Sequence, residues 1–339
     1  MREDGPVPDS PDPLRTIPLA HGGLDRQAER RRDPDLIARL LADPTTRVLP
    51  VAAGAAPLAP AESLFAGPAL SAPAESLFAG LAPSEPGPTA DASERGHASP
   101  PALGWRAPEA GDTAYGQVFL GVADGAARVA LLLPRVKAGA GWVGLRECGA
   151  DLDPADAEAL TTATALGNWH ATHRHCPRCG APTEPANSGW TRRCPQDGSE
   201  HFPRTDPAII VAVTDPEDRL LLARNPAWPE GRLSVLAGFV EPGESLAMTV
   251  AREVFEEVGV RVRDVIYLGD QPWPFPASLM LGFEARTDDA TLVLDPTEIA
   301  EAAWFTRADY RRTVDEGAWG GGTSVSISRR LIQHWLARG

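Results

Sequence analysis

The segment "AREVFEEVG", residues 251–259, constrains this chain most, because it places three glutamates within five residues of an otherwise helical pattern. Like charges three or four residues apart on a helix repel by roughly 0.2–0.5 kcal/mol per pair. On a helical wheel the apolar residues of this segment share one broad side: Ala247, Val250, Ala251, Val254, Phe255 and Val258. Glu253, Glu256 and Glu257 gather on the other side. We therefore expect one side to face a core and the other to collect carboxylates, either in solvent or around a cation.

The residues that flank this helix favour the cation. Gly238 and Gly243 bracket an upstream loop, and Glu244 lies near the helix start, where a carboxylate suits the helix dipole. Downstream, Gly259 can end the helix in the left-handed conformation. Magnesium takes oxygen ligands and completes its shell with water and phosphate oxygens. A strand, a glycine-bearing loop and a carboxylate-faced helix can therefore hold divalent cations against a pyrophosphate.

The whole run "GFVEPGESLAMTVAREVFEEVGV", residues 238–260, resembles the signature of the Nudix hydrolases. Enzymes of that superfamily hydrolyse a nucleoside diphosphate linked to another group. The resemblance implies that Glu253, Glu256 and Glu257 hold Mg²⁺ or Mn²⁺, and that Glu244 pairs with Arg252 to brace the loop and helix. It also implies that Glu256 or Glu257 helps to take a proton from the attacking water.

A second motif, "QPWPFPAS" at residues 271–278, bears on the substrate. Prolines that alternate with Trp273 and Phe275 make a stiff, extended ribbon whose aromatic faces can stack on flat heterocycles. From the residues alone, aromatics buried in a core are equally compatible with this pattern. The array resembles the one that marks dinucleotide specificity in the NADH pyrophosphatase subfamily. On that resemblance the predicted substrate contacts are Gln271, Pro272, Trp273, Pro274, Phe275, Pro276, Ala277 and Ser278.

Four further positions follow from the same resemblance. Ala237 would offer a backbone carbonyl to a metal ion, and Phe239 would contact the adenine. Glu298, in "DPTEIAEAAWF", matches an additional metal-binding glutamate, and Glu301 is its competitor because both lie beside an apolar run. Ser328 lies where the family contacts substrate.

Three of the four cysteines are clustered in "CPRCGAPTEPANSGWTRRCPQDG", which begins at Cys176. Their spacing in a chain with no export signal favours a zinc ribbon over disulfides, and the subfamily carries such a ribbon before its catalytic domain. A four-cysteine ribbon would place its last sulfur at Asp197. Three readings are open: Cys176, Cys179 and Cys194 bind zinc with Asp197 or His201; the site holds no metal; or Cys148 completes the set. In each, the role is structural.

Composition excludes several other classes. The net charge of −14 argues against coating nucleic acid by bulk electrostatics. The N-terminal stretch "MREDGPVPDSPDP" has no apolar core for a secretory signal, and runs such as "AIIVAV" are too short to cross a bilayer. We expect a soluble cytoplasmic protein with no membrane partner.

A length of 339 residues suggests about two domains. We expect an N-terminal region at 1–112 with a partly disordered Ala/Pro-rich insertion, and the rest of a small mixed α/β domain at 113–175. A zinc-ribbon-like segment at 176–205 and a catalytic domain at 206–339 follow. "PAESLFAG" occurs at 60–67 and 73–80, as a duplicated insertion or a pair of helical docking elements. Two copies are too few for a solenoid.

The expected fold class is α+β, with a Nudix α/β/α sandwich after the ribbon. Predicted helices lie around 33–43, at 153–175 with Asp153 as N-cap and Pro154 first, at 245–258, and from Ser326 onward. Predicted strands are 115–122, 127–134, 141–147, 208–213 paired with 219–224 as a hairpin, 233–240, 265–269, 278–286 and 291–295.

These features predict metal-dependent hydrolysis of NADH or NAD to AMP and nicotinamide mononucleotide. Because cleavage of the same pyrophosphate bond within an NAD cap would leave RNA with a 5′-monophosphate, the predicted partners extend to NAD-capped RNA. The alternatives are an ADP-ribose or diadenosine polyphosphate hydrolase, and a nucleotide- or RNA-binding module without turnover. Resemblance alone implies a homodimer.

Overall fold

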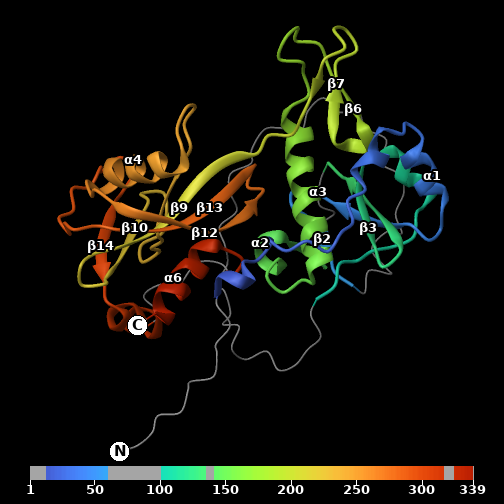
Figure 1. Cartoon of the computed structure of the whole chain (residues 1–339). Helices are drawn as coiled ribbons and strands as arrows, with labels where there is room; N and C mark the ends of the chain where they lie inside the picture. The colour runs from blue at the N-terminus through green and yellow to red at the C-terminus, as the bar shows by residue number, and fades with distance from the viewer. Residues whose placement is uncertain (1–12, 60–100, 135–140, 317–323, 339) are drawn as a thin grey trace, which may run out of the picture.

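The computed structural model describes residues 13–59, 101–134, 141–316 and 324–338, whose arrangement is shown in Figure 1. Both "PAESLFAG" copies lie outside the described residues, so the two interpretations of that duplication remain predictions. Within the described ranges, no helix combines the length and the apolar character that a bilayer span needs.

A three-stranded sheet forms the centre of the N-terminal domain. Its middle strand β4 (Ala126–Leu132) runs parallel to β1 (Arg47–Val51) and antiparallel to β3 (Gly116–Ala123). A second pair joins β2 (Ala55–Pro57) to β5 (Trp142–Gly144). The strands predicted at 115–122 and 127–134 are thus confirmed. The one predicted at 141–147 is a short strand that turns at once into helix α2 (Leu145–Cys148).

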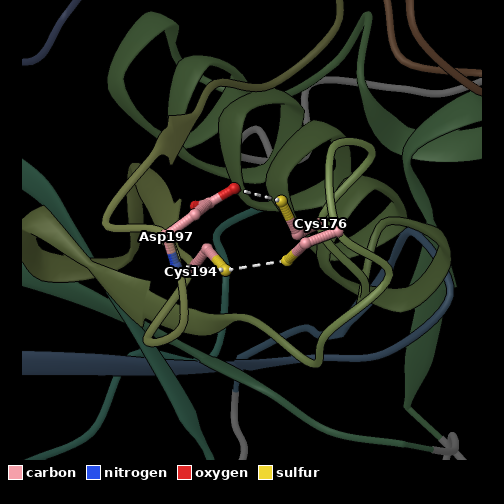
Figure 2. A group of neighbouring side chains, drawn as sticks. Cys176, Cys194 and Asp197 are labelled. Atoms are coloured by element: carbon pink, nitrogen blue, oxygen red, sulfur yellow. Dashed lines mark hydrogen bonds between the residues drawn. The ribbon is translucent and has the colours of Figure 1, made fainter.

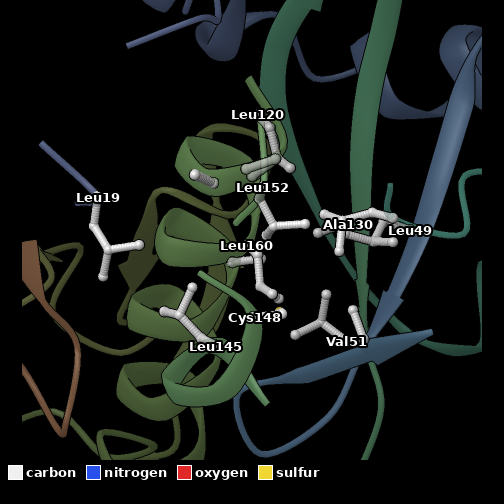
Figure 3. Packing of buried hydrophobic residues seen from close by; sticks show 14 of the residues in the cluster. Leu19, Leu49, Val51, Leu120, Ala130, Leu145, Cys148, Leu152 and Leu160 are labelled. Carbon is white, nitrogen blue, oxygen red and sulfur yellow. The ribbon is translucent and has the colours of Figure 1, made fainter. Parts of the chain in front are cut away.

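Helices cover both faces of this sheet. On one face, α3 (Pro154–Thr172) contributes Leu160 to a core with Leu49 and Leu120, and Cys148 lies in the same cluster (Figure 3). On the other, α1 (Leu36–Ala42) packs against Phe119. The smaller elements are η1 (Pro13–Thr16), η2 (Ala28–Arg32) and η4 (Ala110–Ala114).

Helix α3 begins as predicted and ends early. The Asp153 carboxylate accepts hydrogen bonds from the amides of Ala155 and Asp156 at 2.9 and 3.1 Å, and Pro154 follows it. The helix ends at Thr172 rather than at His175, because the chain there turns to pair with the ribbon. The Thr183 amide donates to the carbonyl of Arg174 at 2.8 Å.

The ribbon is a three-stranded antiparallel sheet at one end of α3 (Figure 1). Its strands are β6 (Glu184–Ala186), β7 (Thr191–Arg193) and β8 (Glu200–His201), with η5 (Asn187–Gly189) between the first two. These strands have only two or three residues each, so the ribbon has a small core.

The C-terminal domain is a mixed sheet between helices, as predicted. The sheet order is β12 (Arg263–Trp273), β13 (Ser278–Arg286), β9 (Asp206–Thr214), β10 (Leu220–Arg224), β14 (Glu301–Phe305), and β11 (Leu236–Phe239) also pairs with β9. The helices are α4 (Leu246–Val258), α5 (Arg307–Asp315) and α6 (Ile327–Ala337). The hairpin, the two helices at 245–258 and from Ser326, and the strands at 233–240, 265–269 and 278–286 are confirmed.

Alternation along β9 divides the two cores of this domain. Ile209 and Val211 belong to the cluster that contains Val254 of α4, whereas Ile210 belongs to the cluster that contains Leu331 of α6. Successive side chains of a strand point to opposite faces, so the continuous apolar run "AIIVAV" serves both helices.

Two local predictions are wrong. Residues 291–295 form no strand; instead the amides of Val293 and Asp295 donate to the carbonyls of Val258 and Glu257 at 2.9 and 3.0 Å. This segment therefore covers the end of α4. The wheel over α4 is also rotated from the predicted one, since Ala247, Ala251 and Phe255 are exposed.

Candidate active site and zinc centre

The inward side of α4 carries carboxylates as well as valines. Val250, Val254 and Val258 are fully buried, and Glu253 and Glu257 on the adjacent stripe are only 9% and 8% exposed. Ser245 caps the helix by accepting from the Met248 amide. Two of the three glutamates thus face the protein, and only Glu256 is largely exposed. This arrangement excludes an ordinary solvated charged face.

Arg252 connects the loop before α4 to the helix. Its Nε and Nη2 donate to the two carboxylate oxygens of Glu244 at 2.7 and 2.8 Å, and Nη2 also donates to the Phe239 carbonyl at 2.9 Å. Its Nη1 lies 3.0 Å from both Glu253 Oε1 and Glu256 Oε2. The Arg252 guanidinium holds the pKa of Glu244 at about 2. The predicted pairing of Glu244 with Arg252 is present in the structure.

Gly238 of β11 explains how Glu253 reaches its place. A Cβ at Gly238 would lie 1.9 Å from the Glu253 Cδ, so only glycine leaves room for this carboxylate against the strand. At the other end of α4, Gly259 has φ 74°, the left-handed conformation predicted for it. Gly238 and Gly259, two of the three glycines in the signature, therefore have a geometric function.

Glu257 is the most perturbed group of the cluster. Burial, followed by the charges of Glu253, Glu298 and Glu256, raises its pKa to about 8. Its Oε2 is buried and has no hydrogen-bond partner among the described residues. Burial also raises the pKa of Glu253, an effect that Arg252 opposes and that Glu256 and Glu298 reinforce. A buried oxygen without a donor, in a group of mutually repelling carboxylates, fits a divalent cation.

Of the two competing downstream glutamates, Glu298 belongs to this cluster. Its charge raises the pKa of both Glu253 and Glu257. Glu301 instead lies on β14, where its Oε2 pairs with Nε of Arg224 at 3.3 Å. Glu298 precedes β14 in a loop, so its approach to α4 depends on the tertiary fold. The sequence motif by itself carries no signal for that approach.

A cavity of about 340 Å³ opens beside the glutamates. Glu257 and Ala237 line it together with Trp273 and Ser328, so it joins the Nudix helix to the "QPWPFPAS" motif. Ser328 Oγ lies 2.8 Å from Ser234 Oγ. Phe239 lies on β11 with 58% of its surface exposed, and Ala237 of the same strand is also exposed.

The aromatic pair of the motif is ordered and half-buried. The rings of Trp273 and Phe275 meet edge to face with centroids 5.0 Å apart, and both pack against the core of the N-terminal domain. The Asn168 side chain on α3 donates to the Pro274 carbonyl at 2.9 Å. The two interpretations of this motif, a core element and a pocket wall, therefore both describe part of it.

Gln271 has a different environment from the rest of the motif. It is fully buried; its Nε2 donates to the carbonyls of Pro18 and Val325 at 2.6 and 2.7 Å, and its Oε1 accepts from the Ile327 amide at 2.9 Å. The side chain thus joins an N-terminal segment to the start of α6, whose Ser326 and Ser328 line the cavity. In this structure the amide of Gln271 is fully used by backbone groups.

Among the residues of the cavity wall that sequence reasoning missed are two arginines and a tryptophan. Arg146, from α2 of the N-terminal domain, lies over the Phe275 ring at 3.9 Å and over the Trp273 ring at 4.9 Å. Arg232 lies over the Trp228 ring at 5.0 Å in the segment between β10 and β11. Nothing in "GLRE" or "WPEGR" signals a site, because the fold alone brings these residues to the cavity.

The zinc ligands predicted from the cysteine spacing lie together. Ligand atoms of Cys176, Cys179, Cys194 and Asp197 all lie within 4.8 Å of one another, and Figure 2 shows the Asp197 carboxylate pointing toward the Cys176 sulfur. The Cys179 and Cys194 sulfurs are 3.5 Å apart. Cys148 is instead buried in the N-terminal core, where desolvation raises its pKa to about 11. It does not complete the set.

Comparison with known proteins agrees with this geometry. The family model of the NUDIX domain matches residues 204–321, the NADH pyrophosphatase zinc ribbon domain matches 171–202, and the NADH pyrophosphatase-like rudimentary NUDIX domain matches 93–169. The fold and site therefore define a Nudix domain that follows a zinc ribbon. Together these matches place the chain in the NADH pyrophosphatase subfamily of the Nudix hydrolases.

Its relatives include proteins named NAD-capped RNA hydrolase NudC. The one from Mycobacterium bovis BCG is 49% identical over 58% of this chain and 65% of its own length, so the chain spans less than two thirds of that relative. The one from Deinococcus radiodurans is 41% identical over 67% of this chain and 80% of its own length. A solved NUDIX hydrolase from Nitrosomonas europaea matches 49% of this chain and 91% of its own, with 18% identity and a TM-score of 0.40.

Proposed function

We propose that this protein hydrolyses the pyrophosphate bond of NADH and NAD, giving AMP and the nicotinamide mononucleotide, with Mg²⁺ or Mn²⁺ at the glutamate cluster. The observation that carries the proposal is Glu257, which lines the same cavity as Trp273 and has a buried carboxylate oxygen without a hydrogen-bond partner among the described residues. Membership of the subfamily supports the same reaction, and the name of these relatives supports NAD-capped RNA as a further substrate.

The metal ions would be held by Glu253, Glu256, Glu257 and Glu298, with the carbonyl of Ala237. When bound, they neutralise diphosphate charge and lower the pKa of a coordinated water. Glu256 or Glu257 accepts a proton from the attacking water. One phosphorus gains the water oxygen, the P–O bond to the bridging oxygen breaks, and that oxygen leaves with the other phosphate.

Other side chains of the chain organise this reaction. Arg252 fixes the loop before α4 by donating to Glu244 and to the Phe239 carbonyl, which holds α4 in place against β11. Phe239, Ser328 and residues 272–278 would bind the dinucleotide, with aromatic faces available for stacking. Arg146 would add a cation to the cavity wall beside Trp273.

A substrate assay with paired variants tests the proposal. Purified protein with Mg²⁺ or Mn²⁺ is incubated with NADH, NAD and NAD-capped RNA, and products are resolved chromatographically. We expect AMP and the mononucleotide, and a loss on the order of 10³-fold for Glu257→Gln, since charge stabilisation by a metal is worth several kcal/mol. Glu301→Gln, outside the cluster, is the matched control. Normal turnover by Glu257→Gln would refute the assignment, and tight NADH binding without product would favour a binding module.

Two coarser features complete the proposal. We propose a cytoplasmic location, because cysteines that form no disulfide and cluster at metal-binding spacing are typical of proteins in reducing compartments. We also propose a homodimer formed through the catalytic domain, on family resemblance. Sedimentation at several protein concentrations distinguishes a dimer from a monomer.

A further inference from the structure

The two halves of the predicted zinc site have the same backbone conformation. Residues 176–181 read "CPRCGA" and residues 194–199 read "CPQDGS". In each half the glycine amide donates to the first cysteine's carbonyl, at 2.9 and 3.0 Å, and the glycine is left-handed, with φ 75° and 71°. In each, the first cysteine's amide donates to the carbonyl five residues later, at 2.8 and 2.9 Å. Asp197 therefore occupies the backbone position that Cys179 occupies in the first half.

The same backbone position demands different support for a carboxylate than for a thiolate. A cysteine sulfur is bonded directly to Cβ, so the backbone and one rotamer fix its place. The oxygens of Asp197 lie one bond farther out, on a group that rotates about Cβ–Cγ and offers two equivalent ligand atoms. Without a further contact, this carboxylate has no unique ligand oxygen.

Ser199 supplies that contact. Its amide and its Oγ both donate to Oδ1 of Asp197, at 2.9 and 2.5 Å. The corresponding residue of the first half is Ala181, which has no hydroxyl. With Oδ1 occupied, Oδ2 remains and lies 3.4 Å from the Cys176 sulfur. Tetrahedral zinc with Zn–S of about 2.3 Å and Zn–O of about 2.1 Å separates sulfur from oxygen by roughly 3.6 Å, so Oδ2 is correctly placed.

His201 supports Ser199 in turn. The Ser199 hydroxyl gives its single proton to Asp197, so it accepts from Nε2 of His201 at 3.1 Å. Its Oγ also lies 3.6 Å from the Cys176 sulfur. Strand β8 fixes His201 by pairing it with Arg192 of β7. His201 thus contacts the ligand group through Ser199, and it is absent from the set of atoms that lie within 4.8 Å of one another in the described part of the chain.

We propose that the ribbon holds zinc through three thiolates and Oδ2 of Asp197, with Ser199 and His201 as positioning residues that select this oxygen. Outer contacts of this kind change metal affinity by about 10- to 100-fold when removed. The proposal concerns zinc affinity and does not rest on the proposed catalytic function.

A double-mutant cycle on the full chain tests it. Zinc affinity is measured by competition with a chromophoric chelator, and zinc content by elemental analysis. We expect Ser199→Ala to weaken zinc binding by about 10-fold or more, and His201→Ala to weaken it less. In an Asp197→Cys background, which restores the chemistry of the first half, Ser199→Ala should have a much smaller effect, because a thiolate needs no selection between two oxygens and only the 3.6 Å contact of Ser199 with the Cys176 sulfur is lost.

Several results would overturn the proposal. Unchanged zinc affinity in Ser199→Ala, or the same loss with and without Asp197→Cys, would show that Ser199 does not act through the carboxylate. The second result also covers a substitution that merely unfolds the ribbon. A larger loss for His201→Ala than for Asp197→Ala would make the histidine the ligand. A wild-type protein that binds no zinc at any tested concentration would remove the site altogether.

Discussion

The zinc ribbon and the glutamate cluster are both suited to cations, but they assemble in opposite ways. In the ribbon, every proposed zinc ligand lies in one of two short turns within residues 176–199. Hydrogen bonds between near neighbours shape each turn. In the catalytic domain, Glu253 and Glu257 come from α4, and Glu298 comes from a loop beyond two further strands. The first site is local, whereas the second depends on how α4 packs against the sheet.

This difference determines what each site tolerates without its ion. Burial and neighbouring carboxylates raise the pKa of Glu253 and Glu257, and the buried oxygen of Glu257 has no partner in the described structure. Packing of Val250, Val254 and Val258 holds them together against that repulsion. A small change in packing should therefore damage the glutamate cluster and leave the ribbon intact.

Gly238→Ala should give the largest effect. The new Cβ would lie within 2 Å of the Glu253 carboxylate (1.9 Å to its Cδ), so this ligand must move. A displacement of about 1 Å can reduce a catalytic rate by about 100-fold, and we expect a loss of that size in NADH hydrolysis with unchanged zinc content. Gly111→Ala is the control, because nothing lies within 4 Å of its Cβ. Equal activity in the two variants would contradict the packing argument.

Arg252→Ala should mainly reduce stability. Removal of the guanidinium leaves Glu244, Glu253 and Glu256 without their shared cation and the Phe239 carbonyl without its donor. Loss of one partner in a fully buried pair costs about 3–5 kcal/mol; the Arg252 side chain is 22% exposed, so we expect about 2 kcal/mol less unfolding free energy. Urea denaturation measures this. If the ribbon loses zinc to the same extent, the two regions are not independent.

The same contrast explains which parts of the site the sequence reveals. The ribbon and the helix caps at Asp153, Ser245 and Ser326 rest on contacts between residues close in sequence, which spacing predicts. The wheel over α4 separated Val254 from Glu257, yet both are buried, because the helix lies between a core and a charged cavity. An amphipathic pattern cannot distinguish a buried charge from an exposed one.

The residues that sequence reasoning missed depend on tertiary contacts. Arg146 approaches Trp273 only because the N-terminal domain packs against the end of β12. The apolar stretch 291–295 has the composition of a strand, but the open hydrogen-bonding groups it meets are those at the end of α4. The sequence pattern cannot distinguish a strand from a segment that covers the end of a helix, since both require alternating apolar contacts.

Protons and divalent cations compete for the glutamate cluster, so its metal affinity should depend on pH. Burial and neighbouring carboxylates raise the pKa of Glu257 from its usual 4.5 to about 8, so the folded protein retains a proton that the unfolded chain releases. The stability of the metal-free protein should therefore fall as pH rises from about 4.5 to 8. Affinity for Mg²⁺ or Mn²⁺ should rise over the same range, by up to about tenfold per pH unit. Calorimetry at pH 6, 7 and 8 measures it, and a flat profile would mean that Glu257 is already ionised.

Arg146→Ala should have the smallest effect and extends the comparison to the two domains. Arg146 lines the cavity beside Trp273, and its guanidinium has no ion pair among the described residues, so it is available to an anionic substrate. An exposed ion pair between this guanidinium and a substrate phosphate is worth about 0.2–1 kcal/mol, which corresponds to an increase in KM of up to about fivefold with little change in kcat. Arg146→Lys keeps the charge but not the planar stacking, and Arg178→Ala on the exposed ribbon surface is the neutral control. An unchanged KM in Arg146→Ala would limit the N-terminal domain to supporting Trp273 and Phe275, and substrate recognition would then lie within the catalytic domain.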